Sequence, residues 1–167
     1  HIGLSNVTAE LVRRAHKVHS IAAVQFEYSL WRREVESSLL PTLRELGIAL
    51  VAWSPLGAGF LTGTVPSLEP TDFRQYNPRF SGSNLATNTS LFAGLIKLSD
   101  EFGITPAQLA LAWLLHQGND IFPIPGTRRA SRVDENAGAS EVRLSAEQLM
   151  LIDQAAPPGV AEGSTLV

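Results

Sequence analysis

Apolar residues recur along the chain with two periods, and these periods predict strands that alternate with helices. Short apolar runs bounded by polar residues or glycine predict strands, which cover residues 1–4, 21–29, 48–52 and 121–124. Apolar residues three or four positions apart predict amphipathic helices. These lie within residues 8–18, 34–47, 91–102 and 105–115, with two more that begin at residues 131 and 145. This order favours an α/β fold with a parallel sheet and helical crossovers.

Helix-capping residues support four of the predicted helix starts. Thr8, Thr105 and Ser131 each carry a hydroxyl that can accept a hydrogen bond from the first turn of a helix. Ser145 and Gln148 have the spacing of a capping box, in which the two residues exchange hydrogen bonds. These residues therefore mark the amino-terminal ends of four helices.

The segment IALVAWSPLGAGFLTG, residues 48–63, departs most from the regular pattern. Its apolar start predicts a strand buried on both faces, and Trp53 ends that strand just before Ser54, Pro55 and three glycines. Glycines let the main chain approach a ligand closely, and their N–H groups can face an anion. An ordinary strand followed by a glycine-rich turn is the alternative interpretation of this segment.

Residues 64–87 form a long segment with neither a helical nor a strand period. The segment is rich in proline, serine, asparagine and threonine. It also carries aromatic and basic side chains, namely Phe73, Arg74, Tyr76, Arg79 and Phe80. A loop of this length within a compact domain is usually functional or disordered, and the aromatic residues favour a functional loop.

Composition narrows the classes of protein that fit this pattern. With 167 residues, 44% hydrophobic and 17% charged, the chain can form one globular domain with a core. Its formal net charge of −3 argues against nucleic-acid and membrane-surface partners, and no apolar run approaches the roughly 20 residues of a membrane span. The absence of cysteine excludes disulfides and thiolate chemistry and fits a cytoplasmic location. No pair of histidines or carboxylates has convincing metal spacing.

Polar residues cluster where the predicted strands end. They are Ser5 and Asn6, Gln25, and the segments 53–63 and 126–136. In parallel α/β folds the carboxyl ends of the strands form the edge where ligands bind. The alternation leaves open a doubly wound sheet or part of a barrel, but no GxGxxG follows the first strand, which weakens the doubly wound dinucleotide fold.

Several motifs, in the same order and at matching spacing, resemble those of the aldo-keto reductase family. They are GLSN at 3–6, QFEYS at 25–29, AWSPLGAGFLTG at 52–63, DFR and PRF within 72–80, and PIPGTRRASRVDENAGA at 123–139. The family fold is a (β/α)₈ barrel, and the similarity covers only its carboxyl-terminal half, from the fifth strand to the tail. The resemblance therefore implies a partial TIM barrel with about four parallel strands, a single partial domain over residues 1–167 that is incomplete as an isolated chain.

The resemblance implies a nicotinamide site at the first three strands. Ser5, Asn6 and Gln25 match the family residues that hydrogen-bond the carboxamide of nicotinamide. Trp53 matches the aromatic residue, most often tyrosine, that stacks on the nicotinamide ring, and a tryptophan preserves such stacking.

The glycine-rich segment matches the part of the family that runs along the cofactor pyrophosphate through backbone N–H groups. The matching residues are Ser54, Pro55, Leu56, Gly57, Ala58 and Gly59. Similar sequences often have a basic or polar residue at position 58 and lysine at position 64, where this chain has alanine and threonine. The resemblance therefore implies that this chain places less positive charge near the phosphates of the cofactor. Arg74 matches a basic loop residue that can fold over the adenosine end of the cofactor.

A basic cluster near the end of the chain matches the family's adenosine site. The matching residues are Gly126, Thr127, Arg128, Arg132, Glu135 and Asn136. A loop, a helix amino terminus and guanidinium groups together hold an anion well. Arginines at positions 128, 129 and 132 fit an extra phosphate on the ribose, so the expected cofactor is NADP rather than NAD.

The catalytic residues of the family have no match in this chain. In the family a tyrosine protonates the carbonyl oxygen during hydride transfer, assisted by a lysine, an aspartate and a histidine, and all four lie on the first half of the barrel. The resemblance thus implies the NADP-binding half of an oxidoreductase that reduces small-molecule aldehydes and ketones to alcohols, with a parent enzyme that is active and a fragment that is inactive alone.

A half barrel also leaves two strand edges and one sheet face without partners. We therefore expect the chain to need the missing amino-terminal half and to behave poorly alone. Met150 is the only methionine and the chain begins at His1, so we expect further residues to precede this sequence. Two alternatives stay open: a regulatory NADP-binding subunit of the kind that accompanies potassium channels, and a non-catalytic remnant that assembles with a separate first half.

Overall fold

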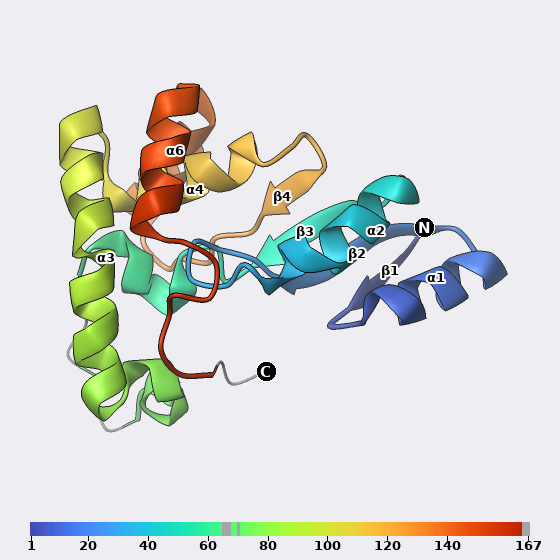
Figure 1. The fold of residues 1–167 in the computed structure, drawn as a ribbon, viewed down its shortest axis with the longest axis horizontal. Coiled ribbons are helices and arrows are strands. Elements are labelled where there is room, and N and C mark those ends of the chain that lie inside the picture. The colour runs from blue at the N-terminus through green and yellow to red at the C-terminus, as the bar shows by residue number, and fades with distance from the viewer. Residues whose placement is uncertain (65–67, 70, 165–167) are drawn as a thin grey trace.

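A computed structural model of the protein describes residues 1–64, 68–69 and 71–164 (Figure 1). The strands are β1 (Ile2–Ser5), β2 (Ile21–Glu27), β3 (Ala49–Trp53) and β4 (Ile121–Pro123). They form one parallel sheet in the order β1-β2-β3-β4. The α-helices are α1 (Ala9–Val18), α2 (Leu39–Glu45), α3 (Gly82–Phe102), α4 (Pro106–His116), α5 (Ala130–Gly138) and α6 (Ala146–Ala155). The expected α/β fold with four parallel strands is confirmed.

Short 3₁₀ turns connect these elements at several points. They are η1 (Glu34–Ser37), η2 (Gly57–Thr62), η3 (Phe73–Tyr76), η4 (Pro78–Phe80) and η5 (Ala139–Glu141). Three of them, η2 to η4, follow β3 and precede α3. Turn η2 contacts α4, and η4 contacts η3 and α3.

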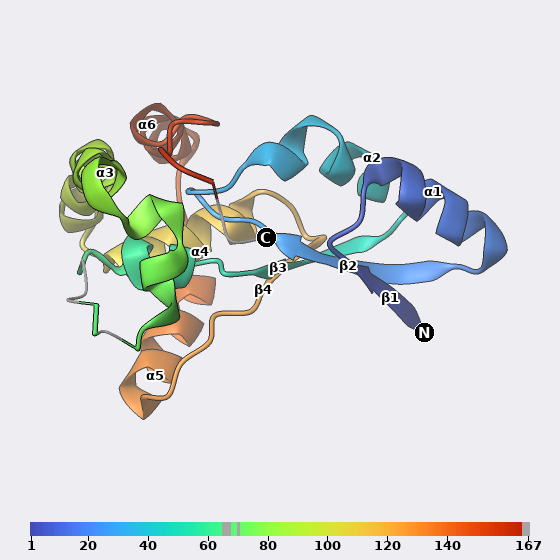
Figure 2. The same cartoon turned by 90° about the horizontal axis from the view of Figure 1, so that it is seen from below.

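The two faces of the sheet differ in burial. Val24, Leu50 and Ile121 lie side by side in register and are at most 2% exposed, beneath the helices. On the opposite face Val51 is half-buried, and its register partner Phe122 is 53% exposed. Figure 2 shows α1 and α2 on the same side of the strands. The expectation that the third strand is buried on both faces is therefore wrong, because helices cover only one face of the sheet.

The sheet is open at both ends in the part of the chain that the structure describes. There β1 pairs only with β2, and β4 pairs only with β3. A barrel requires every strand to have two neighbours. The four strands and their helices are consistent with part of a barrel.

The predicted apolar helix, α4, lies at the centre of the core. It packs against α3, α5 and β4, and its residues from Leu109 to Leu114 are all buried. Within it Trp113 is fully buried and meets the Tyr28 ring edge-on at 5.6 Å. An apolar residue on every face suits a helix enclosed by other elements, so the expectation that this helix is wedged between neighbours is confirmed.

Three of the four predicted helix caps are confirmed. Thr8, Thr105 and Ser145 each accept a hydrogen bond from a backbone N–H in the first turn, and the last two form capping boxes. The predicted cap Ser131 is wrong, because α5 begins one residue before it and Arg129 holds the extended backbone of a cap residue (φ −111°, ψ 123°).

Element boundaries differ from the predicted ones by a single residue at most strand ends and by more at three places. The second strand ends at Glu27 rather than at residue 29, because a tight turn pairs Ser29 with Arg32. The helix expected over residues 34–47 divides into η1 and α2 at Ser38. Helix α3 begins at Gly82, inside the segment expected to be a loop. The sequence pattern did not predict this start, because the first turns of the helix are polar and carry no apolar period. Positions 65–67 and 70 of that segment lie outside the described residues.

A search for helices of membrane-spanning length and hydropathy among the described residues finds none.

Candidate functional site

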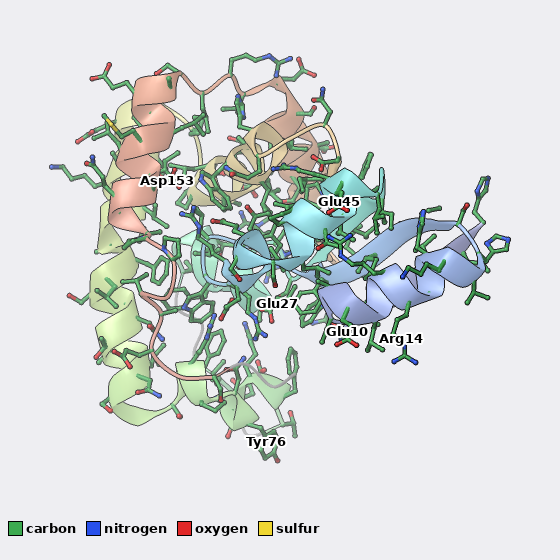
Figure 3. All side chains as sticks on the ribbon, turned by 45° about the vertical axis from the view of Figure 1, so that its right-hand side comes forward. Glu10, Arg14, Glu27, Glu45, Tyr76 and Asp153 are labelled. Carbon is green, nitrogen blue, oxygen red and sulfur yellow. The ribbon has the colours of Figure 1, made fainter. Side chains whose placement is uncertain are left out.

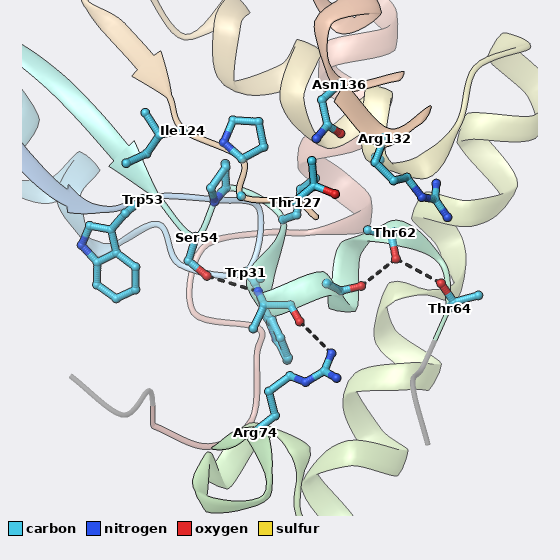
Figure 4. Close-up of a pocket in the computed structure, with 18 of the residues that line it drawn as sticks. Trp31, Trp53, Ser54, Thr62, Thr64, Arg74, Ile124, Thr127, Arg132 and Asn136 are labelled. Carbon is cyan, nitrogen blue, oxygen red and sulfur yellow. Dashed lines mark hydrogen bonds between the residues drawn. The ribbon is translucent and has the colours of Figure 1, made fainter. Parts of the chain in front are cut away.

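A cleft of about 760 Å³ lies at the carboxyl ends of β3 and β4 (Figure 4). Most of the predicted site residues line it: Trp53, Ser54, Pro55, Leu56, Gly57, Gly59, Arg74, Gly126, Thr127, Arg128, Arg132, Glu135 and Asn136. The other three, Ser5, Asn6 and Gln25, are exposed beside the cleft rather than in its lining, at or near the carboxyl ends of β1 and β2. The fold therefore brings the predicted residues to one edge of the sheet.

Trp53 reaches across the sheet toward the first strand. Its indole Nε1 donates a hydrogen bond of 3.3 Å to Oδ1 of Asn6. Because β2 lies between β1 and β3, the half-buried indole crosses β2 on the sheet face that none of the described helices covers, which we call the inner face. Gln25 lies on the same face, two residues before the register partner of Trp53. The backbone N–H of Asn6, which has a left-handed φ of 50°, donates to the carbonyl oxygen of Gln25 at 3.1 Å. Hydrogen bonds thus link three of the four residues predicted to hold nicotinamide.

The turn after β3 is held by its own backbone. Ser54 and Ala58 both have left-handed φ values, 51° and 53°. The N–H of Ala58 donates to Oγ of Ser54 at 3.2 Å, the N–H of Gly57 to the Ser54 carbonyl at 2.9 Å, and the N–H of Gly59 to the Leu56 carbonyl at 3.0 Å. These three N–H groups face inward in the turn, so binding an anion through them requires the turn to exchange its own hydrogen bonds.

An aromatic cluster supports the turn from below. Trp31 stacks on Phe60 with ring centroids 4.1 Å apart, and the rings of Phe80 and Phe92 meet Trp31 edge-on. A Cβ added at Gly57 would lie 2.5 Å from Cε3 of Trp31. The turn can therefore rest on the indole only because position 57 has no side chain.

Arg74 holds the following loop against the turn. Its guanidinium pairs with Asp72 at 2.5 Å and donates to the carbonyl oxygen of Ala58 at 3.1 Å (Figure 4). Hydrogen bonds that the guanidinium and the backbone N–H of Arg74 donate to Asp72 lower the pKa of that carboxyl group to about 2. Arg74 lines the cleft as predicted, and it also links the loop to the turn.

The basic cluster after β4 lies at the other side of the cleft. Arg128 and Arg129 are exposed, while Arg132 forms an ion pair with Glu135. Burial acts to raise the pKa of Glu135, but hydrogen bonds from Arg132 and Thr105 outweigh it and lower the pKa. Two residues expected to contact different parts of a ligand are therefore bonded to each other.

Sequence reasoning missed several residues of the cleft, among them the buried Glu27 and Trp31, which are 6% and 4% exposed. Glu27 ends β2, and its carboxylate lies 3.5 Å from Nη1 of Arg32. Burial raises the pKa of Glu27, and the charges of Arg32 and Arg79 oppose that rise. The available signal was its spacing, because Glu27 lies two residues after Gln25 and so faces the same side of the strand.

Among the residues that the structure describes, no cluster of three or more histidines and carboxylates could hold a metal ion.

Comparison with known proteins places the chain among related sequences and structures. The model of the Aldo/keto reductase family matches residues 1–157. A probable aldo-keto reductase of Glycine max is 44% identical over 165 residues, which are 98% of this chain and 48% of the soybean protein. The chain thus spans about half the length of the curated relatives it matches.

Two solved structures show the same arrangement of elements. A thermostable aldo-keto reductase in complex with the inhibitor epalrestat superposes with a TM-score of 0.70 and 26% identity, over 93% of this chain and 48% of that protein. The glycerol dehydrogenase of Gluconobacter oxydans superposes with a TM-score of 0.85 and 23% identity, over 94% of this chain and 50% of that one. At 23% identity the second likeness supports the fold alone.

Proposed function

The chain belongs to the aldo/keto reductase family, and we propose that it is the cofactor-binding, carboxyl-terminal half of an NADP-dependent reductase barrel. In this proposal residues 1–167 form a partial domain that supplies strands five to eight. The match to about half of each relative and the sheet open at both ends support this assignment.

The observation that carries the proposal is the position of the Trp53 indole across β2. It presents a half-buried aromatic face beside Gln25, with Asn6 at its edge. A flat aromatic ring stacks favourably on such a face. We assign nicotinamide to this face and its carboxamide to Ser5, Asn6 and Gln25. When bound, the reduced cofactor supplies a hydride to a carbonyl carbon.

The rest of the cleft would hold the remainder of the dinucleotide. Ser54, Pro55, Leu56, Gly57 and Gly59 line its middle, and Arg74 is hydrogen-bonded to the turn. The helix start after residue 126 and its arginines line the far side. A cleft of about 760 Å³ falls within the range of about 300–1,000 Å³ that small-molecule sites occupy.

The charges at the far side favour NADP over NAD. Arg128 and Arg129 are exposed there, and Arg132 lies one helical turn away. A ribose phosphate carries charge that a ribose hydroxyl lacks, and guanidinium groups bind phosphate through two parallel hydrogen bonds. Gly126, Thr127, Glu135 and Asn136 would surround the adenosine.

The catalytic groups would come from the amino-terminal half of the barrel. That half would pair with the free edges of β1 and β4 and cover the sheet face that exposes Phe122. The substrate would be a small carbonyl compound held between the two halves. The absence of cysteine supports a cytoplasmic enzyme. The relatives are aldo-keto reductases by name, which favours a reductase over a regulatory subunit.

A titration of the purified protein with NADP⁺ and NAD⁺ tests the cofactor assignment. We expect tighter binding of NADP⁺, and we expect Arg128→Ala and Arg132→Ala each to reduce that preference. Arg143→Ala is the matched control, because Arg143 is also an exposed arginine but lies outside the cleft lining. Equal affinity for the two cofactors, unchanged by the substitutions, would contradict the assignment.

A further inference from the structure

Glu27 places a carboxylate on the inner face of the sheet that the proposed function does not use. It is the last residue of β2, it is 6% exposed and it lines the cleft. Figure 3 marks Glu27 in the middle of the molecule, whereas Glu10 and Arg14 lie on the outer side of α1. Burying a carboxylate costs free energy unless nearby groups compensate for it, so its position needs an explanation.

Glu27 lies next to the aromatic face assigned to nicotinamide. It is the register partner of Trp53 on the neighbouring strand, and neighbouring strands are about 4.8 Å apart. The Trp53 indole also crosses β2 to reach Asn6. A ring stacked on this indole would therefore lie within a few ångströms of the row that contains Glu27.

Burial raises the pKa of Glu27, and two positive groups near it oppose that rise. Nη1 of Arg32 lies 3.5 Å from its Oε2, and the buried guanidinium of Arg79 also attracts its charge. Glu34 is the other carboxylate near Arg32. Its side chain is exposed, and its Oε2 lies 3.3 Å from Nε of Arg32. A positive neighbour stabilises a carboxylate relative to the neutral acid. At a pH above its raised pKa, Glu27 therefore places a negative charge beside the indole.

We propose that Glu27 is an electrostatic residue that makes the site bind the oxidised nicotinamide more tightly than it otherwise would. This inference rests on the proposed function, because it takes nicotinamide to stack on Trp53. The oxidised ring carries a positive charge and the reduced ring carries none, so a carboxylate close to the ring attracts only the oxidised form. Glu27 thereby shifts the relative affinity of the protein for NADP⁺ and NADPH.

The test is a titration of the full-length protein that carries this chain with NADP⁺ and with NADPH at pH 8. We expect Glu27→Gln to weaken NADP⁺ binding by roughly fivefold or more, from the loss of one nearby unit charge, and to leave NADPH binding within about twofold. Glu34→Gln is the matched control: it removes the other carboxylate on Arg32 and should leave the ratio of the two dissociation constants unchanged.

A second variant keeps the inference testable if Glu27→Gln does not fold. Arg32→Gln removes the positive charge that opposes the rise in the pKa of Glu27. In this variant NADP⁺ binding should therefore weaken relative to NADPH binding at a higher pH than in the unmodified protein, as Glu27 takes up a proton. Failure of the unmodified protein to bind either cofactor would overturn the proposed function. Binding of both cofactors with a ratio that neither variant changes would overturn the role of Glu27 alone.

Discussion

The indole nitrogen of Trp53 and the side-chain oxygen of Asn6 lie 3.3 Å apart although 47 positions separate the residues in sequence. The hydrogen bond joins the ends of β3 and β1 over β2 and fixes the direction of the indole plane. The stacking face of the proposed site therefore depends on two separate strands.

Two substitutions of Trp53 should distinguish what its ring contributes to cofactor binding from what its hydrogen bond contributes. Trp53→Phe keeps an aromatic face and loses the N–H, so we expect a smaller loss of NADP⁺ affinity than for Trp53→Ala. Stacked aromatic pairs contribute about 0.5–1.5 kcal/mol, so Trp53→Ala should weaken binding by roughly threefold to tenfold. Calorimetric titration measures both values, and equal affinity in the unmodified protein and Trp53→Ala would rule out stacking on this residue.

The turn after β3 should tolerate no side chain at position 57. Gly57 has a φ of +57°, and an added Cβ would lie 2.5 Å from the Trp31 ring. Gly47 has a similar φ of +67° but nothing within 4 Å of an added Cβ, so it is the control for backbone strain alone. We expect Gly57→Ala to lower the free energy of unfolding by about 1–3 kcal/mol more than Gly47→Ala, the usual range for overpacking. Equal losses in urea denaturation would contradict the close contact.

Arg33 should contribute more to stability than a surface arginine. It is 9% exposed, and it pairs with Asp153 and Glu36 at 2.7 Å each and lies over the Trp113 ring. Its carboxylate partners are partly exposed, at 26% for Glu36 and 47% for Asp153, so the loss is mainly that of hydrogen bonds between charged groups, about 1.5–3 kcal/mol. Arg33→Ala should therefore destabilise the protein by about 2 kcal/mol.

The control for that substitution is Arg13→Ala. Arg13 pairs with Glu45 at 2.5 Å, but both side chains are well exposed, at 42% and 60%. Exposed pairs contribute about 0.2–1 kcal/mol. Urea denaturation measures the free energy of unfolding of both variants. Similar losses of stability in the two would show that Arg33 contributes no more than an exposed arginine.

The ion pair of Asp72 and Arg74 should make the loop beside the cleft sensitive to acid. Arg74 lowers the pKa of Asp72 from its usual 3.8 to about 2. The folded-state pKa is therefore below the unfolded value, so the pair stabilises the protein above about pH 4 and this contribution disappears as the pH falls toward 2. The stability difference between the unmodified protein and Asp72→Asn should shrink over that interval. A difference that stays constant from pH 5 to pH 2 would contradict the pairing.

The sequence predicted the fold class and the region of the site because both depend on local signals. Apolar periods and caps such as Thr8 and Ser145 locate the elements, and motif spacing pointed to Trp53 and the residues after 126. The family and the four parallel strands are confirmed, while the roles of individual site residues stay predictions.

Other features depend on contacts between distant segments, which local patterns do not contain. Trp31 belongs to the cleft because Phe60, Phe80 and Phe92 gather around it. Glu27 is buried and lies near Arg32 of the turn after β2, and the charge of the buried Arg79 acts on it. The start of α3 was missed because its first turns are polar and are held by tertiary contacts. One of these is the buried Asn88, which bonds Arg79 and Glu162.

The rate of NADPH oxidation in the presence of an aldehyde tests most directly the claim that this chain binds the cofactor but lacks the catalytic groups. We predict no oxidation above background by residues 1–167 alone, and oxidation once the amino-terminal half of the barrel is supplied. Reduction of the aldehyde by residues 1–167 alone would contradict the account.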